Sequence, residues 1–323
     1  MYNGAVTMTA KKRALLLEKF EEKAAEAAGF HAVQGASWGR RLERARRLNV
    51  RYLAYLFRRF VIPGSAKARV FWGKRYRWGR PEHSTSMYLY GVLEHAEEVR
   101  LTRFFIRTLQ SEDVFLDIGA NFGFYSLLAS EILEEGRVIA FEPVSFVFRG
   151  LNASAARTTN VEAVNSAVSD RVGTLEFDQA PESRHTGSSF NEAEARVEGA
   201  PVFAFTRVKV ASTTVDAYCA ERKIVPTVIK IDVEGAEKLV IDGGLRTLAA
   251  GTPTIVLEVW KPPQKNENHR DAAAVLKKLG YEVHALTDDG GLKKLDDAEL
   301  EAEFSGGEAA NLVFKKPRRE NAK

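Results

Sequence analysis

The chain has 323 residues, enough for one large domain with an extension or for two small domains. A hydrophobic content of 45% and a charged content of 28% are typical of globular proteins, and no run of about 18 apolar residues predicts a membrane-spanning helix. Cys219 is the only cysteine, which excludes an intramolecular disulfide and a cysteine-rich zinc site, and with no signal-peptide core the protein is predicted to be cytoplasmic.

The net charge of +4 conceals a basic segment near the N-terminus. Residues 37–80 contain fourteen lysines and arginines but one acid, Glu43, so the rest of the chain is net acidic. Residues 10–60 have helical composition and spacing, and a basic helix is expected over residues 40–62. Three roles remain open for this helix: a solvated cover for the rest of the chain, a peripheral contact with an anionic membrane, or a contact with nucleic acid.

The pattern changes after residue 63. A short β-like piece at 68–80 and a helix around 91–109 come first, and from residue 111 apolar runs of strand length alternate with helical patterns. Several of these runs are apolar at nearly every position, which is typical of parallel strands covered on both faces. The predicted strands are 114–118, 137–142, 161–168, 174–177, 227–232, 254–259, 281–286 and 311–314.

This alternation predicts an α/β fold with a doubly wound, mostly parallel sheet. Segments 281–286 and 311–314 are expected to form an antiparallel hairpin at one edge, joined by the polar residues 287–310. Residues 180–200 are polar with many small side chains and are predicted to be a surface loop or a lid. Four regions are expected: a basic helical extension at 1–63, a lead-in segment packing on the main domain at 64–110, the main domain at 111–317 and a basic tail at 318–323.

The stretch FLDIGANFGFYS, residues 115–126, predicts a strand that turns into a helix from Phe124. Gly119 and Gly123 allow a tight turn and a close approach to a ligand. The start of the following helix favours electron-rich ligand groups. The spacing is not G-x-G-x-x-G, which argues against a nicotinamide or flavin site, and a plain strand-to-helix turn is the alternative.

Two further pieces place polar side chains at strand ends. Glu142 follows a strand about twenty residues beyond the glycines, where a carboxylate can accept both hydroxyls of an adenosine ribose; the alternative is a surface glutamate before the turn at Pro143. Lys230 and Asp232 share one face of the strand at 227–232, and such groups are costly to bury unless they pair or meet a ligand. If that strand lies beside the one at 114–118, Asp117 and Asp232 face one crevice.

In this order the three pieces resemble the FkbM family of S-adenosylmethionine-dependent methyltransferases. The matching text over residues 110–315 is DIGANFGFYS, FEPVSFVFRGLNAS, NSAVSDRVGTLEF, IKIDVEGAEKLVIDGG, PTIVLEV and NLVF. The resemblance implies a class I Rossmann-like methyltransferase fold with S-adenosylmethionine as cofactor. It implies that the residues around the cofactor are Asp117, Gly119, Asn121 and Gly123 at the amino-acid end, Glu142 at the ribose, and Ser166 and Ala167 near the adenine.

The resemblance also implies methylation of a hydroxyl on a sugar, a glycolipid or a polyketide product, with Asp232 and Glu234 near the sulfonium and the acceptor. An alcohol is a poor nucleophile while protonated, so a base within hydrogen-bond reach is expected. We predict Asp232 and Glu234 as the catalytic acids, with Lys230 orienting them or stabilising charge on oxygen. Glu237 and Glu258 are further acids near strand ends, and Glu258 has an alternative role in anchoring the loop after its strand.

No metal site is predicted. Paired acids at Asp232 and Glu234 are compatible with a magnesium ion, but nothing in the sequence requires one, and no His/Cys cluster indicates zinc. His185 and His269 are predicted to be exposed loop histidines and not catalytic bases.

The prediction is therefore an O-methyltransferase that acts on a hydroxyl of a glycan, a glycolipid or a related small molecule. A nucleic-acid methyltransferase is one alternative, favoured by aromatic residues within the basic segment. Against it, DVEG stands where amino methyltransferases usually carry a polar residue, two prolines and an aromatic. A non-catalytic partner protein with the same fold is the other alternative, and the sequence determines neither the acceptor nor the oligomeric state.

Overall fold

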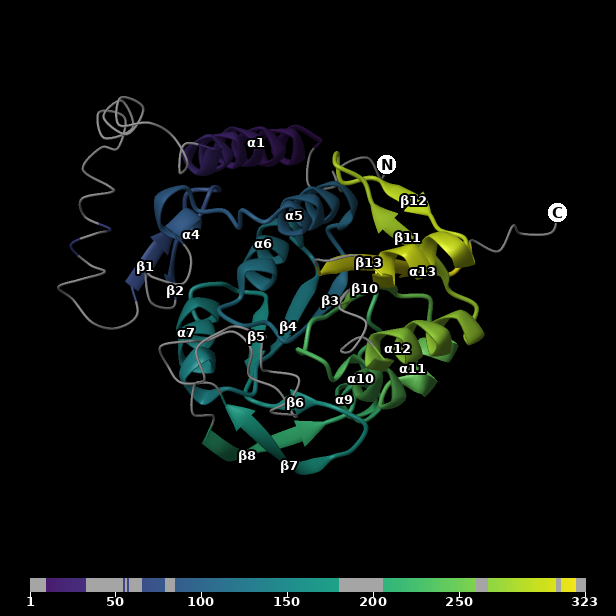
Figure 1. The fold of residues 1–323 in the computed structure, drawn as a ribbon. Helices are drawn as coiled ribbons and strands as arrows, with labels where there is room; N and C mark the ends of the chain where they lie inside the picture. The colour runs from purple at the N-terminus through teal and green to yellow at the C-terminus, as the bar shows by residue number, and fades with distance from the viewer. Residues whose placement is uncertain are drawn as a thin grey trace, which may run out of the picture.

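The structure is a computed structural model that describes residues 10–32, 55, 57, 66–78, 85–179, 206–259, 267–305 and 309–317. Helices cover both faces of a central sheet, so that the molecule has three layers (Figure 1). This is the mostly parallel, doubly wound α/β fold that the sequence predicts, preceded by an N-terminal helix.

The central sheet has eight strands in the order β12-β11-β13-β10-β9-β3-β4-β5. From β5 to β10 all neighbours are parallel. β13 runs antiparallel to both β10 and β11. The strands are β3 Val114–Ile118, β4 Arg137–Phe141, β5 Val161–Val164, β9 Val228–Ile231, β10 Thr254–Val259, β11 Glu282–Leu286, β12 Leu292–Lys294 and β13 Ala310–Lys315.

Alternating apolar side chains on the strands divide the core in two. Phe115 of β3 packs into the cluster on one face, while Leu116 and Ile118 pack into the cluster on the other. The first face is covered by α5 Ala96–Thr108, α6 Phe124–Ile132 and α7 Ser145–Ala155. The second face is covered by α9 Val215–Arg222, α10 Glu237–Asp242, α11 Leu245–Ala250, α12 Glu267–Lys278 and α13 Asp297–Ser305.

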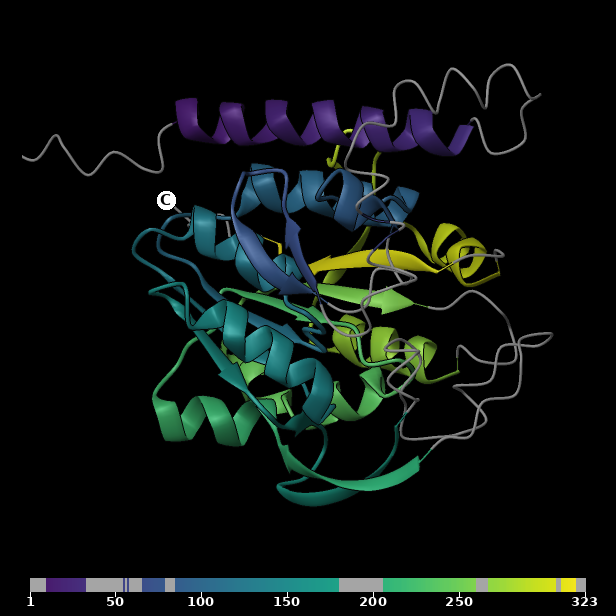
Figure 2. The same ribbon diagram turned by 90° about the vertical axis from the view of Figure 1, so that its left-hand side faces the viewer.

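The N-terminal helix α1, Ala10–Ala32, forms an additional outer layer. It lies across α5 on the side away from the sheet (Figure 2) and buries Leu16, Phe20 and Ala27 in the first core cluster. The remaining part of the predicted helical region, including the basic helix at 40–62, lies outside the described residues apart from Tyr55 and Phe57. Among the helices that the structure describes, none combines the length and apolar character needed to cross a membrane.

The lead-in segment contributes a hairpin and two helices before β3. β1 Ala66–Arg69 and β2 Arg75–Trp78 pair antiparallel, within the predicted β-like region, and α4 Thr85–Leu89 precedes α5. A separate three-stranded sheet contains β6 Ala167–Val168, β7 Gly173–Gln179 and β8 Thr206–Thr213.

Three details differ from the sequence prediction. The strand expected at 161–168 is divided between two sheets, because the chain leaves the central sheet after Val164 and β6 pairs with β8. The antiparallel pairing of the last two predicted strands is present, but β13 also bonds to β10 and therefore lies inside the sheet. The edge is instead β12, which comes with α13 from the polar segment at 287–310 that joins the two predicted strands.

Candidate functional site

A cavity of about 340 Å³ opens where β3, β4 and β9 end at the carboxyl edge of the sheet. Ligands bind at this edge in doubly wound sheets, where neighbouring strands connect to opposite faces. The strand ends and the loops after them contribute Gly119, Ala120, Asn121, Glu142, Pro143, Ser166, Ala167, Asp232, Val233, Glu234 and Glu258. The lead-in segment contributes Trp78, Leu93, Glu94, His95 and Glu98.

Gly119 fixes how closely β3 and β9 meet at the edge of the cavity. Its φ is +80°, and a Cβ at this position would lie 1.8 Å from the carbonyl oxygen of Asp232. The glycine is therefore required both by the backbone conformation and by the contact between the two strand ends.

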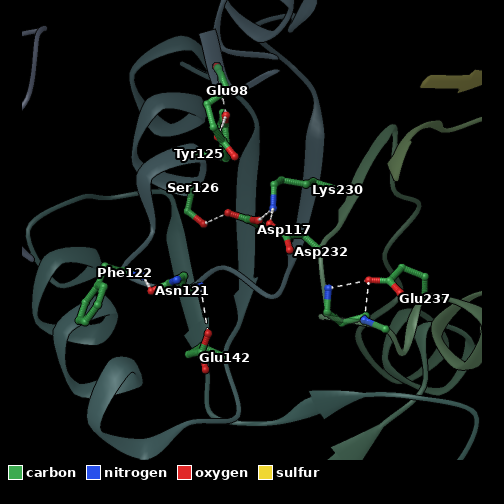
Figure 3. Close-up of polar contacts among 12 residues, drawn as sticks. Glu98, Asp117, Asn121, Phe122, Tyr125, Ser126, Glu142, Lys230, Asp232 and Glu237 are labelled. Carbon is green, nitrogen blue, oxygen red and sulfur yellow. Dashed lines mark hydrogen bonds and ion pairs between the residues drawn. The ribbon is translucent and has the colours of Figure 1, made fainter. Parts of the chain in front are cut away.

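The loop after Gly119 presents backbone groups to Glu142. The backbone N–H of Asn121 donates to Oε2 of Glu142 at 3.0 Å (Figure 3). The backbone N–H of Val144 donates to Oε1 at 2.8 Å. Burial raises the pKa of Glu142 to about 7, although these two N–H groups oppose the shift. A half-ionised carboxylate that keeps further acceptor positions is suited to binding a pair of hydroxyl groups, such as those of a ribose.

Lys230 lies between two carboxylates on adjacent strands. Its Nζ is 2.8 Å from Oδ2 of Asp232 and 4.0 Å from Oδ1 of Asp117 (Figure 3). The other carboxylate oxygen of Asp117 accepts a hydrogen bond from the hydroxyl of Ser126. The β3–β9 register places Lys230 directly opposite Asp117. The sequence left open whether Lys230 and Asp232 pair or contact a ligand, and in the structure they pair with each other.

These charged groups shift one another's pKa values. Burial alone lowers the pKa of Lys230, but the charges of Asp232 and then Asp117 outweigh it, so the pKa lies above the usual value. Burial raises the pKa of Asp232, yet the charge of Lys230 and hydrogen bonds from Glu258 and Lys230 bring it below the ordinary value. Asp232 is therefore ionised and Lys230 is charged at neutral pH.

Glu258, at the end of β10, is hydrogen-bonded to Asp232 across the edge of the sheet. Burial and the charge of Asp232 raise the pKa of Glu258 well above its usual value. Two adjacent carboxyl groups do not both ionise readily, so the proton resides on Glu258 and the negative charge on Asp232.

Glu234 lies in the loop after β9 with a positive φ of 56°, which is uncommon for a residue with a side chain. Glu237 holds this loop, because its Oε1 accepts the N–H groups of Val233 at 3.1 Å and Gly235 at 3.4 Å. The other carboxylate oxygen lies 2.9 Å from Nε2 of His269 in α12, and both side chains are fully buried. The prediction that His269 is an exposed loop histidine is wrong, because α12 packs it against Glu237.

Most predicted site residues line the one cavity. Those found in its lining are Gly119, Asn121, Glu142, Ser166, Ala167, Lys230, Asp232 and Glu234. Two are not part of the lining: Asp117 is buried behind Lys230, and Gly123 begins α6 with its missing Cβ facing Leu151. His185 and the predicted lid at 180–200 lie outside the described residues.

Sequence reasoning missed several lining residues, among them Glu98 and Tyr125. Glu98 lies in the first turn of an amphipathic helix, where an acid is expected for its interaction with the helix dipole. Tyr125 resembles an ordinary core aromatic. Neither position carries a local signal, and only the packing of α5 against α6 brings the two side chains together.

The described residues include no group of three or more histidine, cysteine, aspartate or glutamate side chains arranged to hold a metal ion. The residues at the ends of β3 and β4 are suited to binding a nucleoside. They combine the backbone of the turn after β3, the Glu142 carboxyl and the apolar residues Phe141 and Val168 in one lining.

Comparisons with known proteins agree with this geometry. The model of the methyltransferase FkbM domain matches residues 117–283, which include the end of β3 and the whole of β4, β9 and β10. A comparison with curated protein sequences gives no match.

Among solved structures, one match is an FkbM methyltransferase from Methylobacillus flagellatus KT, with 14% identity, a TM-score of 0.41 and coverage of 70% of this chain and 49% of that one. The chain thus spans about half the length of that relative. M. jannaschii TYW2 in complex with AdoMet matches with 11% identity over 78% of this chain and 87% of that one, with a TM-score of 0.39. Aeropyrum pernix fibrillarin with bound S-adenosyl-L-methionine matches with 12% identity over 67% and 72% of the two chains, with a TM-score of 0.37.

Proposed function

The chain belongs to the FkbM methyltransferase family, and from this premise we propose that it transfers a methyl group from S-adenosylmethionine to a hydroxyl of a glycan, a glycolipid or a related small molecule. The observation that carries the proposal is the position of the Lys230–Asp232 pair in the same cavity as Asn121 and Glu142. The proposed nucleoside-binding residues and the proposed reaction centre thus line the same cavity.

The residues present fit the cofactor. Glu142 would accept the ribose hydroxyls, the turn at Gly119 and Asn121 would contact the amino-acid end, and Ser166 and Ala167 would border the adenine. When bound, S-adenosylmethionine supplies a methyl group on a positively charged sulfur. The ionised carboxylate of Asp232 provides a favourable electrostatic environment for such a charge.

Asp232 is also the proposed base. During methyl transfer, the Asp232 carboxylate would accept the proton of the acceptor hydroxyl and then release it to solvent. The attacking oxygen becomes strongly acidic during this step, so a carboxylate of low pKa is basic enough to take its proton. Lys230 holds the carboxylate in place through the 2.8 Å contact, and Glu234 lines the cavity after Asp232. Much of the rate enhancement would come from positioning the two reactants.

The test is a tritiated methyl-donor assay with cell-envelope polysaccharide and lipid extracts as acceptors. Asp232→Asn is expected to lower transfer by about 10²–10⁴-fold, because the amide cannot accept the proton as a base. Asp242→Asn is the matched control, since Asp242 pairs with Lys238 at the end of α10 outside the cavity. Transfer by Asp232→Asn at the parent's rate would show that another group is the base.

Isothermal titration with S-adenosylmethionine separates the proposal from a non-catalytic partner protein. Micromolar binding supports the enzyme, and no binding supports a scaffold. A nucleic-acid acceptor is tested in the same transfer assay by adding total RNA and DNA. The cytoplasmic location and a membrane contact through residues 40–62 remain predictions, and liposome co-sedimentation with and without residues 1–63 tests the second.

A further inference from the structure

The cavity has two walls that come from different parts of the chain. The carboxyl ends of the strands, within the residues matched by the family model, form the nucleoside end. The opposite wall includes Leu93, Glu94, His95 and Glu98, which precede the matched residues. The Lys230–Asp232 pair lies in the same lining. An acceptor that reaches Asp232 without displacing the cofactor therefore has to lie against this second wall.

Glu98 is the ionisable side chain of this wall that is tied to the reaction centre. The hydroxyl of Tyr125 donates to Oε2 of Glu98 and lies 3.3 Å from the Glu98 carbonyl oxygen (Figure 3). The Tyr125 ring in turn faces Lys230, whose Nζ is 5.4 Å from the ring centroid. Glu98, Tyr125, Lys230 and Asp232 thus form one continuous series of contacts along the cavity.

The environment of Glu98 is unfavourable for a carboxylate without a ligand. Its side chain contacts the neutral hydroxyl of Tyr125, and burial raises its pKa despite the hydrogen bond from Tyr125 and the charge of Lys230. A hydroxyl that donates to Glu98 favours its ionised form, and the ionised form repels anions. Asp232 and Glu234 line the same space, so the described lining residues present several carboxyl groups to an acceptor but one lysine.

We infer that Glu98 binds a second hydroxyl of the acceptor, so that the acceptor is a neutral polyol, such as an unsubstituted sugar ring, and not an acidic sugar or a phosphate ester. Tyr125 is the positioning residue that fixes the orientation of the Glu98 carboxylate. This inference rests on the proposed function and specifies its substrate class.

The experiment uses the full chain and tritiated S-adenosylmethionine, with a cell-envelope polysaccharide extract separated by anion exchange into neutral and acidic fractions. The parent is expected to label the neutral fraction. Glu98→Gln is expected to raise the half-saturating concentration of that fraction by about tenfold or more, because a charge-assisted hydrogen bond is lost. The affinity for S-adenosylmethionine, measured by titration calorimetry, is expected to change by less than about twofold.

Tyr125→Phe provides a second variant that keeps the ring in the core and removes only the hydroxyl. It is expected to raise the same half-saturating concentration, and more acceptor should restore the rate of both variants. Glu97→Gln is the matched control: Glu97 is one residue earlier in α5 and pairs with Arg100 outside the cavity, so its acceptor dependence should equal that of the parent.

Three results would overturn the inference. The first is that the parent labels mainly the acidic fraction. The second is that Glu98→Gln has the same acceptor dependence as the parent. The third is that Glu98→Gln loses affinity for S-adenosylmethionine, which would place Glu98 on the cofactor. In each of these cases the parent still transfers methyl groups, so the proposed function stands. A parent that neither binds S-adenosylmethionine nor labels any fraction overturns both proposals.

Discussion

Glu142 illustrates how burial tunes one carboxyl group. A raised pKa means that the folded chain binds a proton there more tightly than the unfolded chain does, so the ionised form predominates above about pH 7. The ordinary pKa of a glutamate is about 4.3, and without the two backbone N–H groups the shift would be larger. The carboxylate needed to bind a ribose is therefore incompletely formed in mildly acidic solution.

We expect S-adenosylhomocysteine to bind more weakly at about pH 6 than at about pH 8. Hydroxyl donors favour the ionised form, so binding at the lower pH requires a proton to be released, and a shift of one pKa unit corresponds to about tenfold in affinity. Titration calorimetry at both pH values measures the change. Glu142→Gln has no proton to release at this position, so its affinity should not change with pH in this way. If the affinity of both proteins changes equally with pH, Glu142 does not bind the ribose.

Lys230 and Asp232 show why a buried charge at a strand end is informative. Lys230 is only 3% exposed, and the desolvation of an unpaired ammonium would drive it to its neutral form. The two carboxylates reverse that outcome. The pairing was predictable from the alternation of side chains along the strand, whereas the role of Glu258 in Asp232's protonation was not, because it depends on β10 lying beside β9.

Among the elements, the contact between β3 and β9 determines the shape of the site. Both strands are short and apolar apart from Asp117 and Lys230, so the sequence predicted them well. Their adjacency depends on the order of the sheet, which no local pattern specifies. Once adjacent, their ends approach so closely that Gly119 has no room for a Cβ.

Gly119→Ala is expected to lower the free energy of unfolding by about 2–4 kcal/mol, because the methyl group would have to displace the backbone of Asp232. Thermal denaturation monitored by circular dichroism measures the effect. Gly29→Ala is the matched control, since a Cβ at Gly29 in α1 meets nothing within 4 Å and should stabilise that helix by up to about 1 kcal/mol. A variant at Gly119 as stable as the parent would show that the two strand ends separate at little cost.

The break between β5 and β6 shows where an element-level prediction failed. The sequence from 161 to 168 alternates in the manner of one continuous strand, but Asn165 donates through Nδ2 to the carbonyl of Glu142. The chain then turns so that Ser166 and Ala167 reach the cavity. Such a side-chain hydrogen bond competes with the backbone hydrogen bonds of the sheet. The neighbouring strands, and not the segment itself, decide which of the two forms.

At the scale of the whole molecule, α1 adds an outer layer that packs on the first helix layer. Arg13 donates to the carbonyl oxygens of Ile106 at 2.5 Å and Leu109 at 2.6 Å, which are among the last carbonyls of α5 and have no partner within that helix. Arg103 of α5 bonds both carboxylate oxygens of Glu21 in α1. Because the first turn of α5 carries Glu98, these contacts connect the N-terminal helix to the cavity wall.

We expect Arg13→Ala to destabilise the chain by about 1–3 kcal/mol, since two charge-assisted hydrogen bonds to partly buried carbonyls are lost. Differential scanning calorimetry should record a melting temperature lower by several degrees. Lys12→Ala removes an exposed ion pair with Glu134 from the same helix and should change stability by less than about 1 kcal/mol. If the two variants behave alike, the docking of α1 is held by its apolar residues and not by Arg13.

The sequence by itself determined the strands of the central sheet apart from β12, the start of α6 and the identity of the polar residues at the strand ends. These follow from hydrophobic periodicity, from glycine, and from the cost of burying charge, all of which act over short stretches of chain. The tertiary structure alone decided that β13 inserts between β10 and β11, that His269 is buried on Glu237, and that Glu98 and Tyr125 face the cavity. These features join residues distant in the chain, and their free energies come from packing and desolvation, which exist only once the layers have assembled.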